Sequence, residues 1–478
     1  MKITEHLILP GILLVAVVIR LIGVDVNPVN LDEAFTLFNV QYGFGPLTTI
    51  ILEGDNPILH YYFVKTIVLI TQSTDSYFPR LLSVLFSIGT VYVSFRISKS
   101  WMGLLPAILV SGLILFNTQH QYFSHEIRPY SMFIFLSVLL LWDSQRILKG
   151  GISGRFFLHG LLYTALIYTH YLGLIVSAAD LILLLVAFKE SKRIGRFLPG
   201  LIVSAVLLSP LALAFIGRLK SYSTGNSWVP NVNFSALKGV PVYFLNEKWV
   251  VLLIVVLFAV VFYLLIRKRI SYLKELKSDR FFVHVLLFLA AIFFLMLFIS
   301  IRGNSVFIIR YLLFLSIPFY LLLGKVLGLL EMRIQTAVSG VIVLAVVLSF
   351  NIKPEFERSP REIAQYVKEY KVEYPTVVLF PGYYDINLLY YYDRKAFERP
   401  EEKDEYLAKN SILAYYTSNE VINRVFRMNK FQWVVANPGD AESNNKIREA
   451  LKRTHNLVKE ETFKGDFAVL HYRKKEEN

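Results

Sequence analysis

Apolar stretches of about 16 to 21 residues alternate with short polar segments over the first 351 positions of the chain. A helix of roughly this length crosses the hydrocarbon core of a bilayer, so the pattern predicts a polytopic α-helical membrane protein. The eleven predicted spans are 6–24, 80–98, 103–118, 128–146, 156–171, 172–188, 197–216, 249–266, 281–301, 308–324 and 334–351. The pair 156–171 and 172–188 could instead form one long tilted helix, which would place the C-terminal region in the cytosol.

The pattern changes after position 351, where short apolar runs alternate with amphipathic segments. We expect strands at 376–380, 412–416 and 431–436, a hairpin over 458–463 and 467–472, and helices at 361–370, 421–428 and 441–454. The chain therefore divides into a transmembrane domain, 1–351, with a large first outer loop, 25–79, and a soluble α/β domain, 352–478. We expect this second domain to lie outside the cell.

Charge changes the picture in two ways. The net charge is +14, but residues from 352 onward hold 22 Lys and Arg against 21 Asp and Glu, so the excess lies in the membrane part and does not indicate nucleic acid. With a cytosolic N-terminus, the cytosolic segments carry 18 basic residues and the rest of the membrane part 10. This asymmetry predicts a multi-pass protein of the cell membrane with a cytosolic N-terminus and an extracytoplasmic C-terminal domain. The first span lacks a small-residue cleavage site and is expected to be retained.

Candidate chemistry gathers at the outer ends of the predicted spans. Asp32 and Glu33 follow the first span, where a carboxylate can accept a proton from a hydroxyl or bind a metal. The same two acids would also stabilise the first turn of an amphipathic helix over 31–42. Glu126 and Arg128 precede another span, where the arginine could bind a phosphate or simply form a local ion pair.

Two further pairs, Arg310-Tyr311 and His170-Tyr171, occupy the same predicted face, although interfacial aromatic residues are often only anchors. Asp180 lies inside a span and is interpreted as a contact within the bundle. Asn233 begins a glycosylation sequon to which we give no weight. The chain has no cysteine, which excludes disulfides and thiolate metal sites.

Six short motifs follow one another along the first 350 residues. They are Asp32-Glu33, Asp55-Asn56-Pro57-Ile58-Leu59-His60-Tyr61-Tyr62, Arg80-Leu81-Leu82-Ser83, Glu126-x-Arg128-Pro129-Tyr130, Thr169-His170-Tyr171 and Arg310-Tyr311-Leu312. In this order they resemble the GT-C superfamily of integral-membrane glycosyltransferases, in particular the branch related to protein O-mannosyltransferases and lipid A aminoarabinose transferases. The resemblance covers about 1–350 and the C-terminal domain only in general type.

The resemblance implies a polyprenyl-phosphate-linked sugar donor and transfer, with inversion, to a hydroxyl acceptor on the outer face of the membrane. Asp32 would be the general base, with Glu33 beside it, and Glu126 would match an acidic position that some members use for a divalent cation such as Mg²⁺ or Mn²⁺. The donor phosphate would contact Arg128, Arg310, Tyr130 and Tyr311. The remaining substrate contacts would come from Asp55, His60, His170 and Tyr171.

Two departures from the family pattern bear on these roles. Asn56-Pro57-Ile58 stands where members often have His-Pro-Pro, and His125 stands beside Glu126 where a second acid would come two residues earlier. A transporter or flippase of lipid-linked saccharides is the main alternative, but it would predict inverted repeats and charges deep in the spans. A membrane-anchored binding protein is the third interpretation, although the C-terminal domain shows no cluster of chemistry.

Overall fold

A computed structural model describes residues 2–54, 56–150, 154–189, 194–219, 231–267, 271–302, 305–355, 359–435, 441–465 and 467–476. The chain forms two compact units, and each is described by itself. Unit 1 consists of Met1–Val24, Ile51–Phe63 and Arg80–Pro354. Unit 2 consists of Asp25–Ile50, Val64–Pro79 and Glu355–Asn478, so it joins parts of the first outer loop to the C-terminal region.

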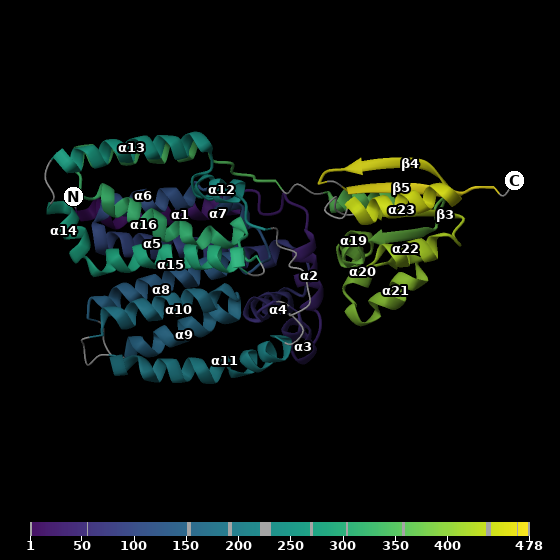
Figure 1. The fold of residues 1–478 in the computed structure, drawn as a ribbon, viewed down its shortest axis with the longest axis horizontal. Coiled ribbons are helices and arrows are strands. Elements are labelled where there is room, and N and C mark those ends of the chain that lie inside the picture. Colours follow the sequence, from purple (N-terminus) through teal and green to yellow (C-terminus); the bar gives the residue numbers. More distant parts are fainter. Residues whose placement is uncertain are drawn as a thin grey trace. The chain divides into compact units, whose positions relative to one another are not determined.

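Unit 1 is a bundle of helices, and α8, α9, α10 and α11 lie side by side in it (Figure 1). Helices α3 (Phe44–Glu53) and α4 (Leu59–Thr71) contain residues of both units. The other helices that lie wholly or mainly in unit 1 are α1 (Lys2–Leu21), α5 (Tyr77–Met102), α6 (Leu104–Leu115), α7 (Thr118–Ser124), α8 (Tyr130–Leu148), α9 (Gly154–Thr169), α10 (Leu172–Ala187), η1 (Ile194–Phe197), α11 (Leu198–Leu219), α12 (Phe234–Leu245), α13 (Lys248–Arg267), α14 (Ser271–Ser278), α15 (Arg280–Arg302), η3 (Ile309–Leu315), α16 (Ser316–Leu327) and α17 (Met332–Leu348).

Each of the eleven predicted spans coincides with a helix of unit 1, or in one case with η3 and α16 together. Four segments of the described chain are long and apolar enough to cross a membrane: α5, α8, α15 and Ile309–Leu327. A fifth is added if α12 and α13, which meet at an angle of 81°, form one bent span. The polytopic helical fold is confirmed, and the number of eleven crossings stays a prediction.

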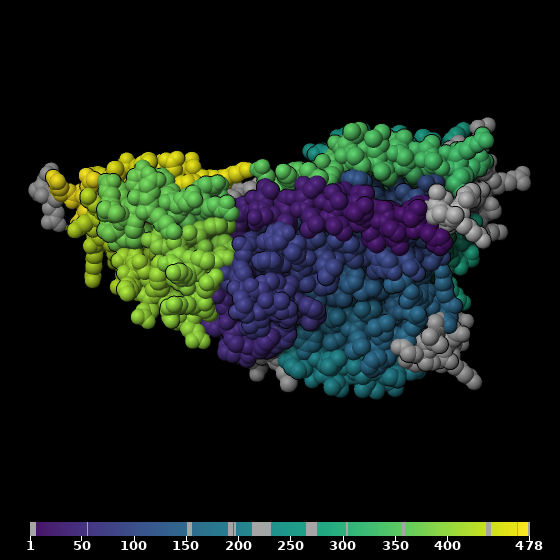
Figure 2. Space-filling view, turned by 180° about the vertical axis from the view of Figure 1, so that it is seen from behind, coloured from purple at the N-terminus to yellow at the C-terminus, as the bar shows by residue number. Residues whose placement is uncertain are grey.

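Many apolar side chains of unit 1 are exposed on the outside of the bundle. On α1, Leu7 and Leu14 are each 65% exposed, and this helix runs over the surface of unit 1 as the dark purple band of Figure 2. Similar exposed side chains include Leu252 on α13, Phe298 on α15 and Leu348 on α17. Exposure of so much apolar surface to water would be unfavourable, whereas contact with lipid tails is not.

Close helix packing in the bundle depends on two glycines. A Cβ atom at Gly160 of α9 would lie 2.3 Å from the carbonyl oxygen of Gly200 on α11. A Cβ atom at Gly200 would lie 2.2 Å from the carbonyl oxygen of Phe156 on α9. Small residues let helix backbones approach in this way in membrane proteins, where packing rather than hydrophobic burial drives association.

Unit 2 contains a five-stranded mixed sheet in the order β2-β1-β3-β5-β4. Strand β1 pairs in parallel with β2 and β3, whereas β5 pairs antiparallel with β3 and β4. The strands are β1 (Thr376–Phe380), β2 (Ile412–Ala414), β3 (Lys430–Val435), β4 (His455–Phe463) and β5 (Phe467–Lys474). The helices are α2 (Leu31–Asn39), α18 (Pro360–Glu369), η4 (Gly382–Tyr384), α19 (Asp385–Tyr392), α20 (Arg394–Phe397), η5 (Pro400–Glu402), α21 (Lys403–Lys409), α22 (Ser418–Val425) and α23 (Ala441–Thr454).

Alternate residues of the sheet strands pack on opposite sides. Trp433 on β3, fully buried, packs with Val421 of α22 and Leu451 of α23 in one apolar core. The next residue back, Gln432, donates from its side-chain amide to the carbonyl oxygen of Val367 on α18 at 3.0 Å. The predicted α/β character of the C-terminal region is confirmed, and the boundary at 351/352 stays a prediction.

Candidate functional site

Arg128 lies in the turn that precedes the N-terminus of α8. Its guanidinium lies 3.4 Å from the hydroxyl of Tyr61 and 3.4 Å from the side-chain oxygen of Asn56. Pro129 follows at the N-terminal cap position of α8, where its missing N–H costs nothing. These contacts position Arg128, a partly buried cation, at the start of α8.

Arg310 approaches the same place from η3. Its guanidinium carbon lies 6.0 Å from the centre of the Tyr130 ring and 5.6 Å from that of Tyr311. Arg128 precedes Tyr130 by two residues, so two arginines lie near the start of α8. These two motifs, far apart in sequence, meet in unit 1.

Rings and aliphatic side chains close the space beside Arg310. The ring centres of His170 and Tyr311 are 4.9 Å apart, and those of Tyr130 and Tyr311 are 6.2 Å apart. The cavity that they line has a volume of only about 10 Å³, the room for a single water. Apolar side chains complete its wall: Phe133, Ile134, Leu172, Leu313 and Phe314. Arg310 thus lies beside an apolar wall, in a space that side chains nearly fill in this structure.

His170 and Tyr171 form the connection between α9 and α10. The Nδ1 atom of His170 accepts from the backbone N–H of Leu172 at 3.2 Å, so the ring is neutral and its other nitrogen carries the proton. Tyr171 occupies the N-terminal cap position of α10. His60, on α4, is 1% exposed, and neither of its ring nitrogens has a hydrogen-bond partner among the described residues. Asp55 lies outside the described residues.

The loop before α8 also holds Glu126 and His125. His125 donates from Nε2 to the backbone oxygen of Arg20 at 2.8 Å, which ties this loop to α1. Glu126 is 6% exposed and acts electrostatically on Tyr130 and on Tyr243 of α12. Within the described part of the chain, no three His, Asp or Glu side chains are arranged to hold a metal ion.

Asp32 and Glu33 belong to unit 2, at the start of α2. Glu33 is fully buried and completes a capping box, because its carboxylate accepts from the backbone N–H of Asn30 at 3.1 Å and its own N–H donates to the Asn30 side chain at 2.9 Å. Asp32 has no part in this cap and is only partly buried. The two adjacent acids thus have different surroundings: Glu33 caps the helix, and Asp32 stays outside the cap.

Contacts within unit 2 fix the start of α2. The side chain of Asn387 on α19 donates to the backbone oxygen of Val29 at 3.0 Å, and the Tyr391 hydroxyl bonds to the N–H of the same residue. Gln41, just after α2, donates to the backbone oxygen of Phe397 at 3.1 Å. The helix that carries Asp32 is therefore anchored to the C-terminal part of unit 2.

No role is assigned to Arg20, a buried residue of unit 1, from the sequence alone. Arg20 is fully buried, and it donates to the backbone oxygens of Ile114 and Leu115 at 2.8 and 3.1 Å and to the side chain of Ser87 at 2.9 Å. It thereby satisfies carbonyl groups that α6 leaves open at its C-terminal end. A lone arginine near the end of an apolar span was the available signal.

No protein-family profile and no curated protein sequence matches this chain. Its fold, however, is shared with solved structures of ArnT and of an archaeal oligosaccharyltransferase, which confirms the expected fold class. The similar solved structures include the apo form of ArnT from Cupriavidus metallidurans, with 13% identity, a TM-score of 0.62 and coverage of 98% of both chains. ArnT from the same organism bound to undecaprenyl phosphate gives 12% identity and a TM-score of 0.61, over 96% of this chain and 97% of that one.

The oligosaccharyltransferase of Archaeoglobus fulgidus, tethered to an acceptor peptide, is also similar. It shares 11% identity and a TM-score of 0.51, over 98% of this chain and 74% of the archaeal chain. A second structure of that enzyme contains zinc and sulfate. At these identities the likeness establishes a shared fold, and the residues of the site must carry any argument about chemistry.

Proposed function

We propose that this protein is a membrane glycosyltransferase that moves a sugar from a polyprenyl-phosphate donor to a hydroxyl acceptor on the outer face of the membrane. The observation that carries the proposal is the meeting of two arginines at the start of α8: Arg128 lies two residues before Tyr130, and the guanidinium carbon of Arg310 lies 6.0 Å from the centre of the Tyr130 ring. Two guanidiniums near one helix start, one of them beside an apolar wall, would suit a lipid phosphate. The fold is shared with an ArnT structure bound to undecaprenyl phosphate, which supports the same donor class.

The proposed reaction breaks the bond between the anomeric carbon and the phosphate oxygen. Negative charge grows on the departing phosphate, and Arg128 and Arg310 stabilise it with charge-assisted hydrogen bonds. Asp32 takes the proton of the acceptor hydroxyl, whose oxygen forms the new bond to the anomeric carbon. Attack from the side opposite to the leaving phosphate inverts the configuration at that carbon.

Further roles follow the same assignment. Tyr130 and Tyr311 contribute hydroxyl donors near the phosphate, and His60, His170, Tyr171 and Asp55 contact the sugar or the acceptor. The sugar could be a hexose or a pentose, and the acceptor a protein, a glycolipid or a glycan. Because no three-ligand set lies within the described residues, no step is assigned to a metal ion. If chelation abolishes the activity and Mg²⁺ or Mn²⁺ restores it, Glu126 is a candidate metal ligand. If thorough chelation leaves the activity unchanged, Glu126 has no metal-binding role in the reaction.

A transporter of lipid-linked saccharides is the second candidate. One observation favours it: the bundle contains buried ionisable residues, including Asp143, His159 and Asp180. Such groups often mark pathways for ions or protons in transporters. The hydrogen bonds of this cluster, described below, give it a different role.

The proposal is tested in cells by mass spectrometry of the glycolipids and glycans of a strain that lacks the gene. We expect one class of glycan or glycolipid to lose a single sugar and the polyprenyl-phosphate sugar to accumulate. Return of the wild-type gene should restore the sugar, whereas a gene with both Arg128→Ala and Arg310→Ala should not. Identical glycan profiles in the two strains would contradict the proposal.

A further inference from the structure

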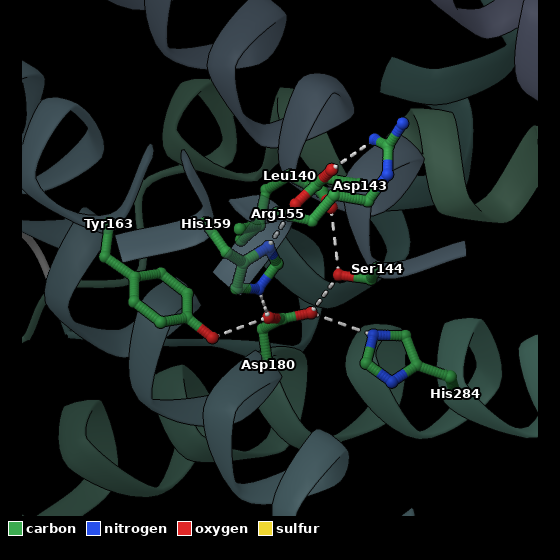
Figure 3. Close-up of polar contacts among 8 residues, drawn as sticks. All are labelled: Leu140, Asp143, Ser144, Arg155, His159, Tyr163, Asp180 and His284. Atoms are coloured by element: carbon green, nitrogen blue, oxygen red, sulfur yellow. Dashed lines mark hydrogen bonds and ion pairs between the residues drawn. The ribbon is translucent and has the colours of Figure 1, made fainter. Parts of the chain in front are cut away.

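A buried polar network joins four helices of unit 1. It contains Asp143 of α8, His159 and Tyr163 of α9, Asp180 of α10 and His284 of α15 (Figure 3). All five residues are at most 5% exposed. Ionisable groups buried inside an apolar bundle are costly unless they are paired and hydrogen-bonded, so the pairing decides what this network does.

Asp180 is the centre of the network. Its Oδ1 atom accepts from Ser144 at 2.8 Å and from Nε2 of His284 at 2.9 Å. Its Oδ2 atom accepts from Nε2 of His159 at 2.7 Å and from the Tyr163 hydroxyl at 2.8 Å. An ionised carboxylate has about four acceptor sites, and all four are used here. A carboxylate so completely bonded is suited to a fixed structural role and poorly suited to passing protons along a path.

His159 bridges two carboxylates. Its Nδ1 atom lies 3.1 Å from Asp143 and its Nε2 atom 2.7 Å from Asp180. Ionised carboxylates only accept hydrogen bonds, so both ring nitrogens must donate and the ring is an imidazolium. Arg155 also donates to Asp143, at 3.1 Å. Two carboxylates therefore face two cations.

The other ends of the four joined helices lead to the segments around Arg128 and Arg310. Helix α8 begins at Tyr130, directly after Arg128 and Pro129. Helices α9 and α10 are joined by His170 and Tyr171, and α15 is followed by the segment that leads to Arg310. A helix is stiff along its axis, so a bond that fixes one end against a neighbour also fixes the level of the other end.

We propose that the Asp143–His159–Asp180 network is a register lock, in which His159 as a fixed imidazolium and Asp180 as the shared acceptor act as positioning residues that set the spacing of Arg128 and Arg310 at the outer end of the bundle. The inference rests on the proposed function for its effect on the donor. The lock itself concerns only the positions of the helices, and the distances between them can be measured in a protein without any activity.

Charge balance supplies the decisive variants. His159→Gln removes one cation and leaves an excess negative charge, whereas Asp143→Asn leaves an excess positive charge. The double variant removes one charge of each sign and restores the balance. If His159 is an imidazolium, each single variant should be worse than the double variant. If His159 is neutral, His159→Gln changes no charge and the double variant brings no rescue, which would overturn the assignment.

Helix geometry is measured with spin labels, because the chain has no cysteine of its own. Leu174 on α10 and Phe298 on α15 are 59% and 61% exposed and suit a pair of engineered cysteines. We expect His159→Gln to shift or broaden the distance distribution between the labels, and the double variant to return it to that of the parent. An unchanged distribution in His159→Gln would overturn the lock whatever the activity. Tyr163→Phe, which removes only one donor to Asp180, should show a smaller change and covers the case of a variant that fails to fold.

Donor kinetics separate positioning from mere stability. A misplaced arginine pair should raise the KM for the sugar-lipid at least fivefold in His159→Gln and leave the KM for the acceptor unchanged. A purely structural loss would reduce only kcat, in proportion to the folded fraction, and would overturn the positioning role. If the parent protein has no transferase activity, the proposed function fails, but the label distances still decide whether the lock exists.

Discussion

Asp32 and Glu33 are neighbours of the same chemical type, and yet the structure gives them different tasks. Glu33 is buried in a capping box with Asn30, whereas Asp32 is partly exposed at the same helix start. The sequence alone supports two interpretations of the pair, a catalytic one and a helix-capping one. The hydrogen bonds divide these interpretations between the two residues, with the cap assigned to Glu33.

Replacement of Asp32 by asparagine tests its proposed role as general base. The amide keeps the shape and hydrogen bonding of the side chain but cannot accept the acceptor's proton. We expect turnover to fall by at least about 10²-fold with sugar-lipid binding largely kept, which is in the range usual for loss of a general base. Steady-state kinetics with a separate binding assay measure both quantities.

The matched control is Glu33→Gln, which keeps an acceptor oxygen for the cap. It should reduce turnover far less than Asp32→Asn and mainly lower stability, because N-terminal caps contribute about 0.5–2 kcal/mol. A dead Glu33→Gln enzyme beside an active Asp32→Asn enzyme would reverse the assignment.

Removal of either guanidinium tests the phosphate site. Arg128→Ala and Arg310→Ala should each cost about 2–4 kcal/mol of transition-state stabilisation, roughly 30- to 1,000-fold in kcat/KM for the donor. Arg302→Ala is the matched control, since Arg302 is exposed at the end of α15 and is assigned no role. Normal kinetics in both site variants would place the donor phosphate elsewhere.

The sequence is a good guide to which residues matter and a poor guide to what they touch. The motifs at 126–130 and 310–312 carry their arginines in the linear order of a known family, so both arginines can be chosen from the sequence alone. The partners of Arg20 and Asp180, by contrast, come from other helices: Gln121 is 101 residues away from Arg20, and His284 is 104 away from Asp180. Hydropathy reports that a residue lies in a span, and it carries no information on which helix lies opposite.

Among the helices and strands, long apolar runs predict the helices of unit 1 and short alternating runs predict the strands of unit 2. The bend of 81° between α12 and α13 was not foreseen, because the first of these helices has only 12 residues and its sequence resembles a loop with a proline, Pro241. The order of the strands in the sheet could not be predicted from the sequence either, because the parallel pairing of β1 with β2 and β3 depends on tertiary packing. Local periodicity fixes an element but not its neighbour.

The cap of α22 makes a prediction about pH. Hydrogen bonds from the backbone amides of Thr417 and Tyr416 hold the pKa of the Glu420 carboxyl below its ordinary value of 4.5. A lowered pKa in the folded state contributes stability above pH 4.5, and this contribution is lost as the pH falls through the folded value. Amide exchange of α22 should therefore be slower in the wild type than in Glu420→Gln near pH 6, and the difference should shrink toward pH 3. The same difference at every pH would contradict this prediction.

For the molecule as a whole, orientation in the membrane follows from the distribution of Lys and Arg and can be checked directly. Because the chain has no cysteine, single cysteines at Asn445 and at Ser278, both exposed, report one side each. We expect an impermeant maleimide to label Asn445→Cys in intact cells and Ser278→Cys only after the membrane is opened. The opposite pattern would invert the topology, and labelling of both in intact cells would contradict the assignment of spans.

The division into two units assigns parts of the first outer loop to the C-terminal domain, which the sequence does not predict. Segments 25–50 and 64–79, which the hydropathy pattern predicts as parts of an outer loop, belong to the same compact unit as the C-terminal sheet. The helix that carries Asp32 is thus built with the α/β domain, and the arginine pair is built into the helical bundle. We infer that a variant in α19 that breaks the contact of Asn387 with Val29, such as Asn387→Ala, should lower turnover through Asp32 without changing donor binding. Unchanged turnover in this variant would separate the α/β domain from catalysis.

The proposed function requires that this protein break the bond between a sugar and a polyprenyl phosphate. The direct measurement uses the purified protein in proteoliposomes, with a polyprenyl-phosphate sugar labelled in the sugar and a mixture of hydroxyl acceptors. We expect free polyprenyl phosphate to appear in step with transfer of the label to an acceptor, and Asp32→Asn to abolish both. Movement of the intact sugar-lipid from one leaflet to the other, with no release of polyprenyl phosphate, would show a transporter and contradict the proposed function.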